Sequence, residues 1–158
     1  MNTSFVFLAN GFEEVEALTT IDIMRRAGME VVTVSINDTL EAEGAHGVTV
    51  KADALISEVN LNNAEWLICP GGSTLAACEP LTNALIAQNS KDGKIAAICA
   101  SPSVIFGPLG LLKGKHAVCY PGMERGMTGA IVGYTPVAID GNIVTGNGPA
   151  AASAFGFA

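Results

Sequence analysis

The 158-residue chain has few charged residues, and basic residues are the scarcer kind. Only 15% of its residues are charged, and 8 lysines and arginines stand against 15 aspartates and glutamates, which gives a formal net charge of −7. This acidic balance opposes binding to the phosphate backbone of nucleic acids and to anionic membrane surfaces. We therefore expect neither nucleic acid nor a membrane as a partner.

Signals for export and for metal binding are also missing. Residues 1–4 carry no basic side chain and lead into an apolar run that is too short for a signal peptide or a membrane span, which predicts a cytoplasmic protein. The cysteines form no C-x-x-C pair and have no histidine at metal-binding spacing. We therefore expect no bound metal, and we expect the cysteines to be free thiols. These cysteines are Cys69, Cys78, Cys99 and Cys119.

Apolar residues, by contrast, are abundant. They make up 49% of the chain, which is long enough to bury a core without disulfides or metal. No internal repeat, charge run or low-complexity linker divides the sequence, so residues 1–158 are expected to form a single domain. This content excludes a disordered chain and indicates strands that are covered on both faces.

Strand-like runs alternate with segments of helical periodicity. The clear predictions are strands at 4–8, 31–36, 65–69 and 94–98 and helices at 13–27 and 79–90. Weaker signals before the strand at 65–69 suggest a strand at 46–50 and a helix at 53–63. After residue 100 they suggest a helix from 101 that is broken near 107, and the start of a helix at 149–158. Between these lie predicted strands at 116–119, 136–139 and 142–145, the last two joined by a hairpin turn at 140–142. This order predicts a flavodoxin-like α/β/α sandwich with a mostly parallel sheet.

The run at 94–98 ends on Cys99 and is followed by Ser101-Pro102, a typical helix start. Cys99 would then lie between a buried strand and a helix N-terminus. Backbone N–H groups and the helix dipole at that place favour a thiolate and hence a nucleophile. The alternative is a cysteine that simply fills the core, since free cysteine is among the most buried residue types.

Two other loops should reach the same sheet edge, where strands end in an open parallel sheet. Gly71 and Gly72 could form an oxyanion pocket with the N–H of Ala100, although a Gly-Gly pair is often an ordinary turn. A partly buried Glu16 would have a raised pKa and could share a proton with the thiolate. Its neighbours Glu13 and Glu14 are interpreted as charges that stabilise the helix start.

Histidine and tyrosine side chains are the other candidates for a place near the thiol. His46 and His116 are the only histidines and are interpreted as surface or structural residues, His116 at the far end of the sheet. Tyr120 should follow its strand at the edge that holds Cys99 and could place its phenol over the thiol. The alternative for Tyr120 is a packing role alone.

Together these segments resemble the ThiJ/PfpI superfamily, in the branch of the Parkinson's-associated redox protein and its bacterial relatives, often described as protein deglycases. The resemblance rests on residues 11–16 with 22–28, 70–72, 96–102, 120–122 and 148–149. It implies a fold like that of class I glutamine amidotransferases, a homodimer, and a reactive Cys99 hydrogen-bonded to protonated Glu16. It further implies oxyanion donors at Gly72 and Ala100, and a C-terminal helix beyond Ala158, so that the chain would be incomplete.

Departures from the family pattern bear on the activity. Ala100 stands where the protease-like branch has a histidine, and Tyr120 where some members place a histidine near the thiol. Gly146-Asn147 replaces a common Ser-Arg pair. Ala100 weakens the peptidase interpretation, and Tyr120 leaves Glu16 as the only evident proton carrier. With Gly146-Asn147, the family's anion-binding arginine is absent.

Two functions therefore remain open, with an intracellular cysteine peptidase less favoured than either. The first is a cofactor-independent enzyme of glyoxalase III or deglycase type, in which Cys99 attacks a small reactive carbonyl. The second is an oxidative-stress sensor or chaperone that uses oxidation of Cys99.

Overall fold

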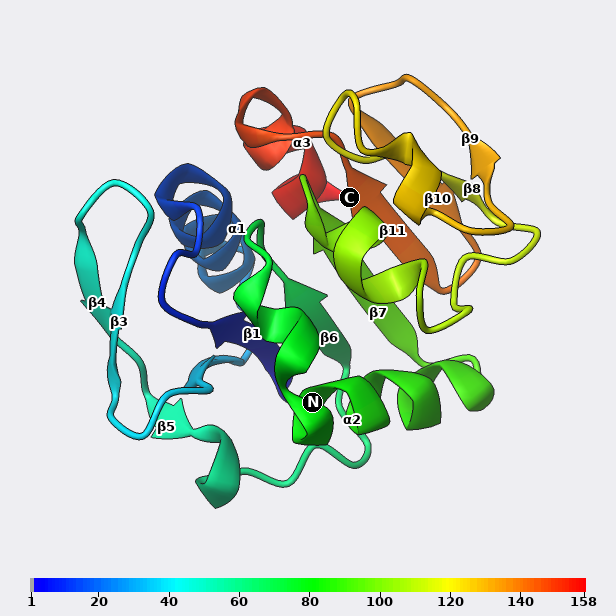
Figure 1. The fold of residues 1–158 in the computed structure, drawn as a ribbon. Coiled ribbons are helices and arrows are strands. Elements are labelled where there is room, and N and C mark those ends of the chain that lie inside the picture. Colours follow the sequence, from blue (N-terminus) through cyan, green and yellow to red (C-terminus); the bar gives the residue numbers. More distant parts are fainter. Residues whose placement is uncertain (1) are drawn as a thin grey trace.

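A computed structural model describes residues 2–158 (Figure 1). Its centre is a seven-stranded sheet in the order β10-β11-β7-β6-β1-β2-β5, in which β10 alone runs antiparallel to its neighbour. The flavodoxin-like, mostly parallel sheet that the sequence predicts is confirmed. The strands of this sheet are β1 (Ser4–Leu8), β2 (Val31–Ser35), β5 (Ala54–Leu55), β6 (Trp66–Cys69), β7 (Lys94–Ile98), β10 (Val137–Asp140) and β11 (Ile143–Gly146).

Helices cover both faces of this sheet. One face packs against α1 (Glu14–Arg26) and α3 (Ala152–Phe157), through buried side chains such as Val6, Ile68 and Ile98. The alternate residues of the same strands point to the other face, which holds α2 (Glu79–Ser90) and the helical segment η3 (Pro102–Phe106). Because side chains alternate along a strand, burial on both faces makes the central strands apolar throughout.

Short elements surround the sheet. Two-stranded ribbons are formed by β3 (Glu41–Glu43) with β4 (Thr49–Lys51), and by β8 (His116–Ala117) with β9 (Ile131–Val132). Single turns of 3₁₀-helix occur at η1 (Ile56–Glu58), η2 (Thr74–Ala77), η4 (Glu124–Gly126) and η5 (Pro149–Ala151). Among residues 2–158, no helix combines the length and the apolar character needed to cross a bilayer.

The long helices and the central strands match the sequence prediction closely, whereas two short elements do not. The helix predicted over 53–63 is wrong: its first part is the edge strand β5, which pairs with β2, and only η1 is helical. The strand predicted at 46–50 lies at 49–51, since residues 44–47 form the turn of the β3–β4 hairpin. The secondary structure of both segments depends on pairing with a neighbouring strand, and such pairing cannot be read from the local sequence.

Three predictions near the C-terminal half hold with smaller changes. The helix after Cys99 is the short π-helical segment η3, which ends at Gly107, where a side chain would collide with the backbone of Gly126. The hairpin at 140–142 is confirmed by the antiparallel pairing of β10 with β11. The final residues are helical, as η5 and α3.

Candidate functional site

Cys99 follows β7 directly and adopts a backbone conformation that is unusual for a side chain. Its φ is +65°, in the left-handed region that few residues other than glycine enter. Its N–H donates to the carbonyl of Gly146 at 2.9 Å, and its carbonyl accepts from the N–H of Tyr120 at 2.7 Å. Hydrogen bonds to the end of β11 and to the segment after β8 therefore hold residues 99–101, the elbow that follows β7, in this strained turn. Strained backbone of this kind is a frequent feature of functional sites.

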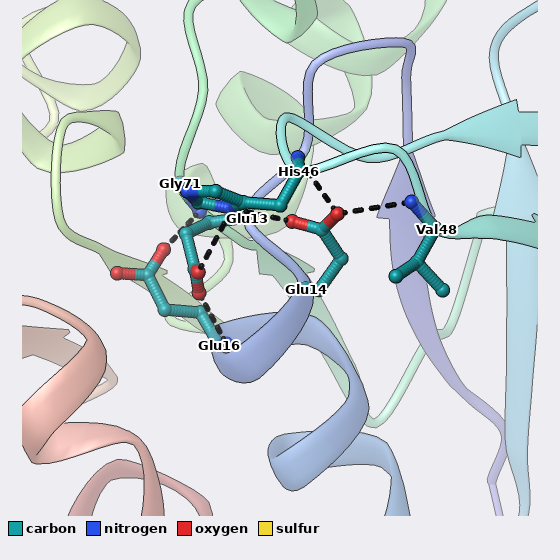
Figure 2. Close-up of polar contacts among 6 residues, drawn as sticks. All are labelled: Glu13, Glu14, Glu16, His46, Val48 and Gly71. Carbon is teal, nitrogen blue, oxygen red and sulfur yellow. Dashed lines mark hydrogen bonds and ion pairs between the residues drawn. The ribbon is translucent and has the colours of Figure 1, made fainter.

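Glu16 is a fully buried residue in the first turn of α1. Its Oε1 accepts the N–H of Gly71 at 2.9 Å, as Figure 2 shows. Its Oε2 is buried without a hydrogen-bond partner among the described residues, and the carboxyl lies beside the side chain of Cys99. One carboxylate oxygen is thus fixed by the protein, while the group as a whole faces the candidate nucleophile.

Burial makes ionisation of this pair difficult. It raises the pKa of Glu16 to about 7. The adjacent Cys99 thiol and the hydrogen bond from Gly71 oppose this rise, and the negative charge of Glu13 reinforces it. Burial and the charge of Glu16 raise the pKa of Cys99 to about 12, against a smaller lowering by the N–H of Ala100. Ionisation of the pair therefore begins near pH 7, and the one proton that then remains can lie on either group.

This result corrects one expectation from the sequence. A helix start after Cys99 suggested a thiol with a lowered pKa, but η3 has only five residues and the thiol lies beside a carboxylate. A thiolate at neutral pH therefore requires the shared proton to lie on Glu16.

Gly71 is required for space rather than for its backbone angles. A β-carbon at this position would overlap Oε1 of Glu16 and lie 2.9 Å from the β-carbon of Cys99. The neighbouring N–H groups of Gly72 and Ala100 donate to no backbone oxygen among residues 2–158, and that of Ala100 interacts with the Cys99 sulfur. Neither N–H is therefore committed to a backbone acceptor, and both lie in loops beside Cys99 where an oxyanion could accept from them.

The remaining sequence candidates lie as follows. Tyr120 is half exposed and bonds to Cys99 through its backbone, while its ring packs on Gly148, so the structure supports packing and shows no contact of its hydroxyl with the thiol. The N–H of His116 bonds to Asp140 at the opposite end of the sheet. His46 bonds to Glu14 and not to Cys99 within the described chain.

Glu14 has a role that the sequence did not reveal. Its buried carboxylate accepts three hydrogen bonds from the β3–β4 turn, namely His46 N–H at 2.8 Å, His46 Nδ1 at 2.9 Å and Val48 N–H at 3.2 Å (Figure 2). These bonds outweigh the effect of burial and lower the pKa of Glu14 to about 2. The partners lie more than thirty residues away, so no local pattern could have indicated them.

Two further features of the fold could bind a metal or a ligand. Glu13, Glu14 and His46 offer ligand atoms within 4.8 Å of one another, but both oxygens of Glu14 already accept hydrogen bonds. An apolar cavity of about 190 Å³ lies between α1, α3 and the sheet, and neither Cys99 nor Glu16 lines it. Neither feature contains Cys99 or Glu16, and the first bears on that pair only through the charge of Glu13.

Comparison with known proteins shows the family and agrees with the fold. The model of the DJ-1/PfpI family matches residues 3–158. The chain belongs to the DJ-1/PfpI family. A solved structure described as oxidized DJ-1 from Toxoplasma gondii superposes with a TM-score of 0.94 at 38% identity, covering 99% of this chain and 87% of that one.

Two curated relatives show how the family domain is used in other chains. Protein DJ-1 homolog B of Arabidopsis thaliana is 36% identical over 96% of this chain, which spans only 35% of the plant protein. A deglycase of Pyrococcus abyssi, PYRAB04690, is 31% identical over 91% of this chain and 89% of its own length. The chain thus spans about a third of the plant relative and most of the archaeal one.

Proposed function

We propose that this protein is a cysteine-dependent enzyme, needing no cofactor, that acts on small reactive carbonyl compounds in the manner of a glyoxalase III or a deglycase. The observation that carries the proposal is the contact between Cys99 and a buried Glu16 whose pKa lies near neutrality. A proton carrier with such a pKa both gives and accepts protons efficiently at neutral pH. The archaeal relative named as a deglycase supports the same class of reaction.

With methylglyoxal as substrate, the reaction begins when the Cys99 sulfur forms a bond to the aldehyde carbon. The carbonyl oxygen takes the negative charge, receives hydrogen bonds from the N–H groups of Gly72 and Ala100, and accepts the proton of Glu16. The Glu16 carboxylate then removes the proton from the carbon that is bonded to sulfur and delivers it to the adjacent carbon, which was the ketone. One carbon is oxidised and its neighbour reduced, which gives a thioester of a hydroxy acid.

Water completes the reaction by hydrolysing the thioester, which releases lactate and restores the Cys99 thiol. Atoms and electrons balance, because methylglyoxal plus water gives lactate plus one proton, so the sequence of steps needs no external oxidant or reductant. A peptidase reaction is less well supported, because no histidine contacts Cys99 within residues 2–158. We further propose that the protein is a homodimer, as the family resemblance implies, and that it is cytoplasmic, as the sequence of its first residues predicts.

Consumption of methylglyoxal by the purified protein, with lactate measured as the product, tests this proposal. Cys99→Ala should reduce the rate to that of buffer alone, because the nucleophile is lost. Cys78→Ala is a matched control, since it removes a free and partly buried cysteine from another part of the fold. Equal rates for the unchanged protein and Cys99→Ala would contradict the proposal.

A second function is favoured by one comparison, the Toxoplasma structure described as oxidized. In this alternative, peroxide oxidises the Cys99 thiolate to a sulfinate, which protonated Glu16 and backbone N–H groups stabilise. Peptide mass spectrometry after mild peroxide should find two added oxygens on Cys99, and Glu16→Leu should change the extent of oxidation. An unchanged mass at Cys99 would exclude this function.

A further inference from the structure

Ser101 takes part in none of the steps above, yet its side chain is fully buried beside them. Its hydroxyl donates a hydrogen bond to the carbonyl oxygen of Pro70. The N–H of the same peptide unit belongs to Gly71 and donates to Oε1 of Glu16 at 2.9 Å. Since a peptide unit is planar and rigid, one plane connects the Ser101 hydroxyl with the Glu16 carboxyl.

These contacts form a closed ring. Ser101 lies two residues after Cys99 on the same elbow, the Pro70–Gly71 peptide joins it to Glu16, and Glu16 interacts with Cys99. We propose that Ser101 is a positioning residue, which acts through the Pro70–Gly71 peptide and determines how the shared proton is divided between Glu16 and Cys99. The inference rests on the proposed role of that pair.

The physical basis is polarisation of the shared peptide. A carbonyl that accepts a hydrogen bond makes the N–H of its own amide a stronger donor, and hydrogen bonds to a charged acceptor gain most from this. The Ser101 hydroxyl therefore stabilises the carboxylate form of Glu16. It keeps part of the shared proton on Cys99, which limits the resting fraction of thiolate.

Few other groups can produce this effect. Among the described residues, the titratable groups that act on Glu16 are Cys99 from the elbow and Glu13 from its own helix, and the loop after β6 contributes the Gly71 N–H. Nδ1 of His46 lies 3.9 Å from Glu13. The neighbouring helix α3 has no charged side chain.

The experiment measures the rate at which iodoacetamide alkylates Cys99 between pH 5 and pH 10, by peptide mass spectrometry, in the unchanged protein and in Ser101→Ala. Loss of the hydroxyl destabilises only the form with ionised Glu16. In Ser101→Ala, the midpoint of the rise in alkylation rate with pH should therefore move up by about 0.3 to 0.5 pH units. The rate on the plateau above it should increase by about twofold to threefold, and the rate at low pH should stay the same.

Ser103→Ala is the matched control. Ser103 is buried on the same helical segment and its hydroxyl also donates to a backbone carbonyl, that of Met123 at 2.6 Å, but this carbonyl lies outside the ring. The control should retain the profile of the unchanged protein. If Ser101→Ala does not fold, Ser101→Gly deletes the same hydroxyl and carries the same expectation.

A profile for Ser101→Ala that matches the unchanged protein would overturn the inference, and so would an equal shift in both serine variants, because the effect would then be structural. Alkylation needs no substrate turnover. If the protein does not consume methylglyoxal, the proposed enzyme activity is contradicted, but the alkylation profiles still test the role of Ser101. If turnover is normal and the profile of Ser101→Ala is unshifted, only the role of Ser101 is contradicted.

Discussion

Glu14 and Glu16 are buried carboxylates two residues apart in the first turn of α1, and their surroundings act on them in opposite directions. Glu14 accepts three hydrogen bonds from the β3–β4 turn, and its pKa falls to about 2. Glu16 accepts one from Gly71 and faces a thiol, and its pKa rises to about 7. The number of donors, rather than burial alone, separates a permanently charged anchor from a group that can carry a proton.

The largest expected effect follows from removing the acid function of each residue in turn. Glu16→Gln retains the shape but cannot transfer a proton, so kcat for methylglyoxal should fall by about 100-fold to 10,000-fold. Glu14→Gln should leave kcat within about threefold while lowering the thermal midpoint, because it weakens the attachment of the β3–β4 turn. Equal losses of kcat in the two variants would remove the distinction between them.

Two glycines allow the same comparison to be made by steric means. A β-carbon on Gly71 would overlap the Glu16 carboxyl, and one on Gly44 would overlap the Glu14 carboxyl. Gly71→Ala should therefore reduce kcat by about 100-fold through misplacement of the pair. Gly44→Ala should cost about 1 to 3 kcal/mol in the free energy of unfolding, measured in urea, with kcat close to that of the unchanged protein. The reverse pattern would contradict the assignment of the two carboxylates.

The pH dependence of stability should also differ between the two residues. The pKa of Glu16 is higher in the folded protein than the ordinary value of 4.5, so its contribution is present below pH 4.5 and is lost as pH rises through about 7. The loss should be about 1 to 3 kcal/mol in the free energy of unfolding. Glu16→Gln should remove this decline between pH 4.5 and 7, and a decline that persists in the variant would contradict the shift.

Glu14 has the opposite sign. Its pKa is lower in the folded protein than the ordinary 4.5, so its contribution is present above pH 4.5 and is lost as pH falls through about 2. Glu14→Gln should therefore flatten the acid limb of the stability curve in urea titrations. An acid limb that is the same in both proteins would show that Glu14 does not cause it.

His46 should produce the smallest effect, since its side chain is 74% exposed. Hydrogen bonding and charge from Glu14 raise the pKa of His46, so its contribution is present below the ordinary value of 6.5 and is lost as pH rises through the folded value. His46→Ala should lower the thermal midpoint by about 2 °C or less at pH 6 and by less at pH 9. A larger loss at pH 9 would contradict this interpretation.

Much of the fold was accessible from the sequence because its signals are local. The apolar runs at 4–8, 67–69 and 95–98 are buried on both faces, and the helices between them have clear boundaries, so the topology follows from their order. Segments whose structure depends on a distant partner were less predictable. The edge strand β5 exists because it pairs with β2, and sequence reasoning assigned it to a helix.

The candidate site shows the same division. Cys99, Glu16 and the glycine pair could be placed together because all three follow the ends of parallel strands or begin the next helix. The bonds of Glu14 to the turn at 44–48 and of Ser101 to Pro70 join residues about thirty positions apart. The pKa of the thiol was expected in the wrong direction, because burial and a neighbouring carboxylate outweigh a short helical segment.

The central claim is that Glu16 and Cys99 share a proton at neutral pH. Its most direct test is the rate of Cys99 alkylation by iodoacetamide as a function of pH, in the unchanged protein and in Glu16→Gln. The unchanged protein should show a rise with a midpoint near pH 7 followed by a plateau, and Glu16→Gln a single rise shifted upward by about 2 pH units. One common midpoint for both proteins would contradict the account.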